Sequence, residues 1–462
     1  MIKKTSTVLF ILLNILYSEV FEGLTIATAK NNPNILMVEN SLDLINSWNN
    51  DTAPYSIAYL NRDSTLYVPC KIPGYDDSQF AGRFKKVTWD GEIIWDYILP
   101  QEICKPHHDI AILPNNNILA ICTEEKSQQE AESAGFVGID GPFELDMIVE
   151  IEPIGNNNAN IVWKWHFWDH LIQDVNPNLN NYGIISEHPE LLDINVNGTS
   201  GNGNIDGVRD WNHCNSISYN KKLNQIVISS RKMDEFYVID HSTTMQEAAT
   251  SQGGIYGKGG DFLYRWGNPE NYNRGTANNQ ILFDQHGVDW IPDGYIGAGN
   301  FLLFNNNHSP GSSAVLEIEN VADENGFYTI TNDQPFAPNS YNWIYQSDFY
   351  SGSQSGAFRL SNGNTIITSA VERYVFEVTY DKELVWEYYP NSAVSRAIKY
   401  PYNYLSYTLG DLSNDEELNI LDIILIIEII INENTFNSIA DINLDHEIDI
   451  LDAIQMINLI LS

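Results

Sequence analysis

Along most of the chain, short apolar runs alternate with polar turns in a repeating order. The first half of each unit is an apolar strand, a polar turn and a second apolar strand, as in HDIAILPNNNILAIC and GAFRLSNGNTIITSA. Asn and Gly at these turns supply the positive φ angles of tight hairpins. The second half is a strand, a turn and an aromatic strand, as in FKKVTWDGEIIWDY and YVFEVTYDKELVWEYY. Each unit therefore predicts four strands, which is one propeller blade.

Five full units begin near Tyr55, His107, His213, His286 and Ser355. The N-terminal run NILMVENSLDLINSW matches the second half of a sixth unit, and the distant run SRAIKYPYNYL would supply its inner strand. Such sharing closes a ring and removes exposed sheet edges. We therefore expect an all-β fold, a six-bladed β-propeller over residues 30–405. Seven blades are the alternative, because the Asn- and Gly-rich insertion at 169–209, expected to be loop with a short helix, is long.

From Gly410 the pattern changes to two acidic loops, each followed by an apolar helix, with starting points 441 − 411 = 30 residues apart. Oxygen-bearing side chains occupy positions 1, 3, 5, 9 and 12 of each loop, and the carbonyl at position 7 completes the ligand ring of a calcium loop. The predicted ligands are Asp411, Ser413, Asp415, Glu417, Asn419 and Asp422 in the first loop, and Asp441, Asn443, Asp445, Glu447, Asp449 and Asp452 in the second.

This tail, residues 410–462, resembles a type I dockerin, whose duplicated loops end in Asp at position 12. The resemblance implies a small α-helical calcium-binding domain and a cohesin-type partner. Both loops depart from the family at position 6, where Glu416 and His446 replace glycine. The apolar run IILIIEIII is either core of the tail or part of a docking face.

Charge and the N-terminal residues narrow the setting. The chain has 24 Lys and Arg against 61 Asp and Glu, a net charge of -37, which disfavours binding to nucleic acid or anionic membranes. The run MIKKTSTVLFILLNILYSEVFEG resembles a secretory signal, with Lys3 and Lys4 before the apolar stretch 8–17. We expect residues 1–29 to be a signal peptide and leader, and the protein to be secreted (periplasmic or extracellular). A retained membrane anchor is the alternative, although the stretch is short.

The four cysteines are Cys70, Cys104, Cys122 and Cys214. Their spacing fits neither a dense disulfide scaffold nor a zinc site. Cys70 and Cys122 end equivalent strands in successive units, which makes them candidates for neighbours, and the pairing stays open at this point.

Polar residues gather near the predicted inner strands, which line the channel of a propeller. His107 and His108 open the second unit, His213 and Asn215 open the third, Arg231 ends the third unit's second strand, and His286 opens the fourth. Side chains from several blades converge on one channel, so these residues would form a local island of positive charge in a strongly acidic chain.

The motifs HHDIAILPNNNILA, DWNHCNSISY with SSR, and DQHGVDW with NFLLFNNN resemble the aryl-sulfate sulfotransferase family, a bacterial six-bladed propeller, over roughly residues 35–405. The resemblance implies transfer of a sulfuryl group from a phenolic sulfate donor to a phenol acceptor through a sulfated histidine, without a nucleotide cofactor. It assigns the nucleophile to His286, the grip on the sulfuryl oxygens to His213, Asn215 and Arg231, and a further active-site histidine to His108 rather than His107. One departure is the run of Asn305–Asn307, where the family has an FDNG-like stretch; another is the short chain ahead of the propeller.

These residue types suit the chemistry. Sulfuryl transfer resembles phosphoryl transfer, in which positioning and charge stabilisation do most of the work. Imidazole is a base that is largely neutral at pH 7, a second histidine can exchange a proton with the phenol oxygen, and a guanidinium grips two oxygens of a tetrahedral anion. Simpler alternatives are that His213 caps a loop and that Arg231 pairs with Asp234. The whole propeller could also be a non-catalytic binding module or a sulfate-ester hydrolase.

Overall fold

The structure is a computed structural model that describes residues 20–29, 32–74, 81–196, 208–402, 404–405, 410–413, 415, 417–432, 439–443 and 447–461. The predicted signal segment up to residue 19 lies outside these ranges, as do Glu416, Asp445 and His446 of the predicted calcium loops. In the described ranges, every helix falls short of the length and apolar character that a bilayer-spanning helix requires.

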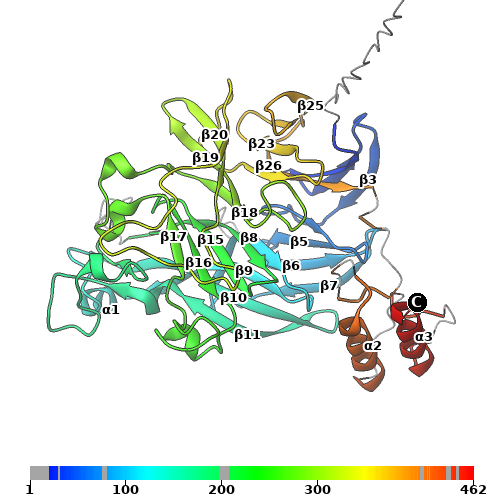
Figure 1. Cartoon of the computed structure of the whole chain (residues 1–462), viewed down its shortest axis with the longest axis horizontal. Coiled ribbons are helices and arrows are strands. Elements are labelled where there is room, and N and C mark those ends of the chain that lie inside the picture. Colours follow the sequence, from blue (N-terminus) through cyan, green and yellow to red (C-terminus); the bar gives the residue numbers. More distant parts are fainter. Residues whose placement is uncertain are drawn as a thin grey trace, which may run out of the picture.

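Six antiparallel sheets of four strands surround a central channel (Figure 1), which confirms the six-bladed propeller. Blades 1 to 3 are β4 (Tyr59–Leu60), β5 (Leu66–Lys71), β6 (Gly82–Val87) and β7 (Ile93–Ile98); β8 (Lys105–Ile112), β9 (Ile118–Lys126), β10 (Phe143–Ile154) and β11 (Asn158–His166); and β14 (Cys214–Asn220), β15 (Gln225–Ser230), β16 (Glu235–Asp240) and β17 (Tyr264–Trp266). Blades 4 to 6 are β18 (His286–Trp290), β19 (Phe301–Ser309), β20 (Ser312–Ile318) and β21 (Trp343–Tyr345); β22 (Gly356–Arg359), β23 (Thr365–Ser369), β24 (Tyr374–Val378) and β25 (Leu384–Tyr388); and β26 (Val394–Pro401), β1 (Gly23–Ala29), β2 (Asn34–Val38) and β3 (Leu44–Asn49).

Blade 6 joins the two ends of the propeller. Its inner strand is β26, as the sequence predicts, and β26 pairs antiparallel with β1, with Thr25 opposite Lys399. The first strand begins at Gly23, so the propeller starts before the boundary expected at residue 30. Residues 23–29 therefore belong to the ring and not to a leader.

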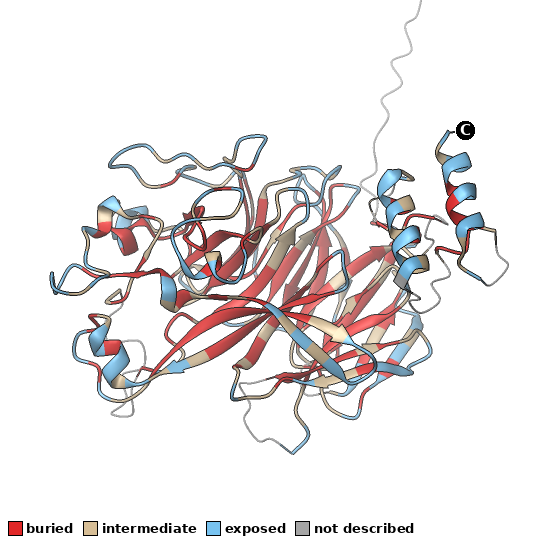
Figure 2. Ribbon diagram, turned by 90° about the horizontal axis from the view of Figure 1, so that it is seen from below, coloured by how far each residue is buried: buried red, intermediate tan, exposed pale blue. Residues whose placement is uncertain are grey.

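Burial explains why the middle strands are continuously apolar. Every residue of β15 and β16 is buried, because each blade packs between two others. The outermost strand β3 is mostly exposed, and half of the residues of β7 are exposed. Figure 2 shows the buried strands as a continuous red interior, with exposed loops around it.

Three blades share a polar contact that ties the first hairpin to the third strand. An Asn at the hairpin turn donates to a Glu carboxylate in the pairs Asn117–Glu150 (2.6 Å), Asn300–Glu317 (2.7 Å) and Asn364–Glu377 (2.6 Å). In two cases the same carboxylate also binds a cation of the next blade, in the pairs Glu317–Arg359 and Glu377–Lys399, each at 2.6 Å. These buried pairs connect neighbouring blades, and removing one partner would leave an uncompensated buried charge.

The insertion after blade 2 contains short elements, namely η1 (Phe167–His170), η2 (Ile185–Glu187) and the parallel pair β12 (Leu171–Ile172) and β13 (Leu192–Asp193). No further blade forms from its described residues. The remaining elements are α1 (Gln128–Ser133), η4 (Glu247–Ala249), η5 (Pro269–Tyr272), η6 (Ala277–Asn279), α2 (Ile420–Asn432) and α3 (Ile450–Leu461).

The tail helices α2 and α3 pack on each other through a small cluster that contains Ile426, Ala453 and Met456. Much of both helices is exposed, including the apolar residues Ile420 and Ile450 (Figure 2). One face of the apolar run IILIIEIII is therefore core of the tail, and docking through its exposed face stays a prediction.

The four cysteines are buried and free. Cys122 lies in the same apolar cluster as Cys104, whereas Cys70 belongs to the cluster between blades 6 and 1. The neighbour of Cys122 is therefore Cys104 and not Cys70, because Cys104 directly precedes β8, the strand that pairs with β9.

Candidate active site

The regular pairing of β18 with β19 is interrupted near the start of β18. His286 pairs with Phe304, and the register then shifts before Asp289. Gly287 has φ 69°, and a Cβ there would lie 3.0 Å from Cα of Gly356 in the next blade, so this bulge requires glycine. Blades 2 and 3 have register shifts near the start of their inner strands as well. Such bulges re-aim side chains, here at one end of the channel.

Residues from the inner-strand regions of all six blades line a cavity of about 50 Å³ at this end of the channel. Three of the predicted site residues, His108, Asn215 and His286, are in its wall. The other lining residues are Tyr55, Ser56, Gln354, Ser355, Ser395 and Arg396. A space of this size suits a group of a few heavy atoms.

The hydrogen bonds of His286 determine its neutral tautomer. Its Nδ1 lies 2.9 Å from the carbonyl oxygen of Asp284 and 2.8 Å from Oδ1 of Asn306. Asn306 is oriented by its own amide nitrogen, which donates to the carbonyls of Ser351 (2.6 Å) and Gln354 (3.0 Å). Because both partners of Nδ1 are acceptors, the proton of the neutral ring is on Nδ1 and the lone pair is on Nε2. The N–H of Gln354 donates to that Nε2 over a longer distance, 3.2 Å.

The surroundings keep His286 neutral. Burial is the largest cause, and together with the positive charges of His213 and Arg231 it lowers the pKa of His286 to about 3, against the opposing hydrogen bonds to Asn306 and the Asp284 carbonyl. A neutral imidazole with a defined lone pair is a nucleophile.

The two histidines of blade 2 are coupled to each other. His107 is buried, its Nε2 lies 2.9 Å from Oδ1 of Asp146, and its Nδ1 lies 2.8 Å from Nδ1 of His108. Burial would lower the pKa of His107, but the carboxylates of Asp146 and, farther away, Asp210 outweigh it and raise that pKa. His108 has φ 56°, and its ring is in the cavity wall. The structure therefore favours His108 over His107 as the residue that faces the cavity.

His213 stands behind this wall. Its ring centroid lies 4.7 Å from that of His108, and its Nδ1 lies 2.6 Å from Oδ2 of Asp210. The carbonyl of His213 accepts from the N–H of Arg231 at 3.0 Å. His213 therefore contacts His108, and it is not among the residues that line the cavity.

Arg231 is held by the loop that carries His286. Its Nη2 forms an ion pair with Oδ1 of Asp284 at 2.8 Å, and Oδ2 of Asp284 accepts from Asn307 at 2.6 Å. The expected surface pair with Asp234 is therefore replaced by a pair with Asp284, whose N–H donates to Asp234 at 2.7 Å. In the described part of the chain, the buried Nε of Arg231 has no hydrogen-bond partner.

Asn215 presents a different atom from the one expected. Its amide nitrogen donates to the carbonyl of Gln285 at 2.7 Å, which fixes the orientation of the group. Its buried Oδ1 has no hydrogen-bond partner among the described residues. Asn215 therefore offers an acceptor as well as its second amide hydrogen, whereas a grip on sulfuryl oxygens uses donors alone.

Several residues of this region have no counterpart in the sequence analysis. Arg396, on the closing strand β26, lines the cavity and forms an ion pair with Asp109 at 2.6 Å. The Tyr59 hydroxyl donates to the same carboxylate at 2.8 Å. Next to this group, burial raises the pKa of Asp289 to about 6. Charged residues inside otherwise apolar inner strands are the sequence signal that would have identified Asp109 and Asp289.

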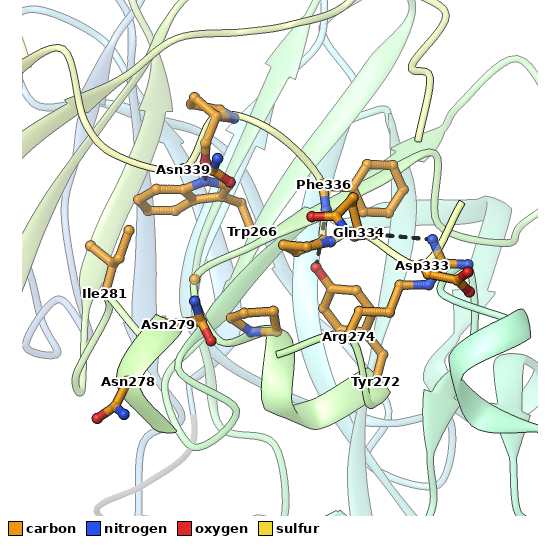
Figure 3. Close-up of a pocket in the computed structure, with 14 residues that line it drawn as sticks. Trp266, Tyr272, Arg274, Asn278, Asn279, Ile281, Asp333, Gln334, Phe336 and Asn339 are labelled. Atoms are coloured by element: carbon orange, nitrogen blue, oxygen red, sulfur yellow. Dashed lines mark hydrogen bonds between the residues drawn. The ribbon is translucent and has the colours of Figure 1, made fainter. Parts of the chain in front are cut away.

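A larger cavity of about 510 Å³ lies elsewhere, between the end of blade 3 and the loop that precedes β21 (Figure 3). Its aromatic residues are bound by neighbouring groups: Trp266 donates to the carbonyl of Pro338 at 2.7 Å, and Tyr272 accepts from the N–H of Phe336 at 3.3 Å. Arg274 donates to the carbonyl of Gln334 at 3.1 Å. None of the predicted site residues lines this cavity.

In the first tail loop, Asp411, Asp415 and Asp422 bring one carboxylate oxygen each to within 4.8 Å of one another. Asp422 also accepts from the N–H groups of Ser413 (2.7 Å) and Asn419 (2.9 Å). In the second loop, Asp452 accepts from the N–H groups of Asn443 and Asp449. These oxygen donors fit a hard divalent cation, while Asp445 lies outside the described residues.

Comparison with known proteins gives one match that covers most of the propeller. A family model described as Arylsulfotransferase (ASST) matches residues 67–407. No curated protein matches the chain in sequence. Among solved structures, a protein of unknown function from Bacteroides caccae is similar at 11% identity over 82% of this chain and 98% of its own, with a TM-score of 0.45. Virginiamycin B lyase from Staphylococcus aureus is similar at 10% identity over 81% of this chain and 88% of its own, with a TM-score of 0.37.

Proposed function

Because the chain belongs to the arylsulfotransferase family, whose substrates are aryl sulfates and phenols, we propose that it transfers a sulfuryl group between them through a sulfated His286. The observation that carries the proposal is the pair of acceptors at Nδ1, since it leaves the lone pair on Nε2. No nucleotide cofactor is required, because the donor ester already contains the activated sulfuryl group.

In the first step, Nε2 of His286 attacks the sulfur of the donor, the bond between sulfur and the phenolic oxygen breaks, and a sulfohistidine forms. The N–H of Gln354 lies next to Nε2 and would then donate to a sulfuryl oxygen. In the second step the phenol acceptor takes the group and Nε2 regains its lone pair. Asn306 keeps the ring in one orientation throughout.

The positive charges near His286 would stabilise the transferring anion. Arg231 contributes a buried Nε without a partner in the described residues, and Asp284 holds its other end in place. His213 adds charge when it is protonated. We therefore propose that these two residues act on the sulfuryl oxygens through their charge, because neither of them lines the cavity.

Asn215 has a different proposed role, in binding the phenol. A buried acceptor without a donor costs about 1–3 kcal/mol, and a phenol O–H would satisfy Oδ1 of Asn215. His108, in the same wall, is the group that exchanges the proton of the phenol oxygen.

The test is intact-mass analysis after a brief mix with 4-nitrophenyl sulfate and no acceptor. We expect one added sulfuryl group on His286, and His286→Ala should abolish both the label and turnover. His188→Ala is a matched control, because His188 is half-exposed and lies outside the cavity wall. Labelling that survives His286→Ala would overturn the proposal.

The same mixture separates the alternatives. Release of 4-nitrophenol that continues only after phenol is added indicates a transferase. Continued release without phenol indicates a sulfate-ester hydrolase, and no release at all indicates a binding module.

We also propose that the tail binds calcium as a dockerin-like domain of a secreted protein, with a cohesin-type partner. The clustered carboxylates of the first loop support calcium, and the exposed apolar residues of α2 and α3 support docking. Bound calcium would neutralise carboxylates that otherwise repel one another. Circular dichroism of the full chain should show helix gained with calcium and lost with chelator; identical spectra would contradict the calcium proposal.

A further inference from the structure

Three side chains of blade 2 form a continuous chain of hydrogen bonds that ends in the cavity wall. Oδ1 of Asp146 lies 2.9 Å from Nε2 of His107, and Nδ1 of His107 lies 2.8 Å from Nδ1 of His108. The first two are buried, and His108 lines the cavity together with His286. His108 is the member of this chain that can reach a bound phenol oxygen.

The contact between the two Nδ1 atoms holds a single proton. When His107 is cationic, its Nδ1–H donates to His108, so the proton of a neutral His108 is on Nε2 and that atom is an acid. When His107 is neutral, its remaining proton is on Nε2 towards Asp146, and His108 must donate through Nδ1, so its Nε2 is a base. The protonation of His107 therefore decides whether His108 is an acid or a base.

We propose that Asp146, His107 and His108 form a proton relay, in which His108 exchanges the proton with the phenol oxygen and His107 and Asp146 are positioning residues that set its tautomer. This deepens the proposed sulfuryl transfer and rests on it. The relay assigns a task to His107, which the family resemblance leaves out, and to Asp146, which the sequence analysis did not single out.

Every proton that moves in the relay has a donor and an acceptor. As the donor's bond between sulfur and oxygen breaks and His286 takes the sulfuryl group, Nε2–H of His108 passes to the departing phenolate oxygen. His108 receives the Nδ1 proton of His107, and the cationic pair becomes neutral. The acceptor phenol reverses these movements when it gives its proton to Nε2 of His108 and attacks the sulfohistidine.

Groups on several elements surround this pair and set its charge. Asp146 on β10 also accepts from the N–H of Cys214 (2.5 Å) and the hydroxyl of Thr123 (3.3 Å), so its carboxylate is fixed. Asp210, in the segment before β14, also raises the pKa of His107. The titratable neighbours of His108 include His107, His213 (ring centroids 4.7 Å apart) and Tyr55 (5.9 Å). Two carboxylates therefore favour the cationic form of the pair, which is the acid needed for the first step.

The relay is tested by its dependence on the leaving group. Rates of His286 labelling are measured with 4-nitrophenyl sulfate, whose phenolate leaves without help, and with 4-methylphenyl sulfate, whose strongly basic phenolate needs a proton. In Asp146→Asn and His107→Gln we expect labelling by 4-methylphenyl sulfate to fall by about 10- to 100-fold, and labelling by 4-nitrophenyl sulfate by less than about threefold.

The matched control is Asp261→Asn. Asp261 pairs with the buried His170 at 2.8 Å, outside the cavity wall, so the same change is made to a buried Asp–His pair with no path to the cavity. Its two rates should keep the ratio of the parent protein. Melting temperatures identify any variant that does not fold, and the relay has two independent variants.

An equal loss with both donors in Asp146→Asn and His107→Gln, or no loss with either, overturns the relay. Failure of the proposed function looks different, because the parent protein would then show no label on His286 with either donor.

Discussion

Two histidines near the starts of inner strands, His107 in blade 2 and His286 in blade 4, are equally hidden from solvent, at 4% and 5% exposure. Their pKa values nevertheless move in opposite directions. The pKa of His107 is raised, although burial alone would lower it, because the carboxylates of Asp146 and Asp210 outweigh burial. Burial lowers the pKa of His286 to about 3, and the charges of His213 and Arg231 add to it.

The difference shows that the partner of the ring, and not the depth of burial, decides the chemistry of a channel histidine. The carboxylate partner of His107 favours its protonated form. An amide and a carbonyl orient His286 as firmly, at 2.8 and 2.9 Å, without adding negative charge. One propeller can therefore keep a protonated and an unprotonated histidine in the same channel at the same pH.

The largest effect should come from giving His286 the kind of partner that His107 has. Asn306→Asp places a carboxylate at Nδ1 and should raise the pKa of His286. Labelling by 4-nitrophenyl sulfate in the parent protein should change by less than about twofold between about pH 8 and about pH 5, whereas in the variant it should fall at least about tenfold over this range.

The control for this exchange is Asn305→Asp. Asn305 donates to the carbonyl of Ile281 at 2.9 Å, so its replacement also removes an amide donor, but its side chain does not bind His286. A fall in the labelling rate at low pH in Asn305→Asp, or no such fall in Asn306→Asp, would contradict the view that the partner of Nδ1 sets the pKa of His286.

A smaller effect is expected on stability, with opposite signs at the two sites. The pKa of folded His286 is below the ordinary 6.5, so the unfolded chain binds more protons and stability is lost as pH falls from 6.5 towards 3. His286→Gln should remove this loss and gain about 2 kcal/mol relative to the parent between about pH 8 and about pH 5. Urea unfolding at both pH values measures it.

For His107, the pH dependence of the stability contribution has the opposite sign. Its folded pKa is above the ordinary value, so its contribution is complete below about pH 6.5 and is lost as pH rises through the raised pKa. His107→Gln should therefore cost more stability at about pH 5 than at about pH 8. Slopes of the same sign for the two variants would mean that the partners do not control the two rings.

The smallest effect is expected at the carboxylate–histidine pair of Asp210 with His213. This pair is partly exposed, and His213 is not in the cavity wall. Asp210→Asn should slow labelling of His286 by less than about tenfold. A loss of several hundredfold would place His213 in direct contact with the transferring group.

The sequence predicted the blades well, because the period of strands and turns repeats five times and the residues of each strand agree with it. It also predicted β26 as the strand that completes blade 6. It missed β1, because residues 23–29 directly follow an apolar segment and read as part of a leader. Their strand character depends on pairing with β26, which is distant in sequence.

The site was predictable in its histidines and not in their partners. His286 and His108 stand at strand starts that the repeat identifies, and both line the cavity. Asn306 lies in the very stretch that departs from the family, and its role depends on the carbonyls of residues more than forty positions away. Asp146 is one of four acidic residues in β10, and only the folding of blade 2 brings it to His107.

The closing strand has a consequence for how the molecule is made. Ser395 and Arg396, which line the cavity, are part of β26, the inner strand of blade 6, which pairs with the N-terminal strand β1. During synthesis, every histidine of the site leaves the ribosome before this strand does, so five blades can exist while the cavity still lacks a wall. Ring closure spans nearly the whole propeller, and contacts of such long range form slowly. A chain interrupted before residue 394 would therefore contain His286 and still lack the finished cavity, so the proposed activity is coupled to completion of the propeller.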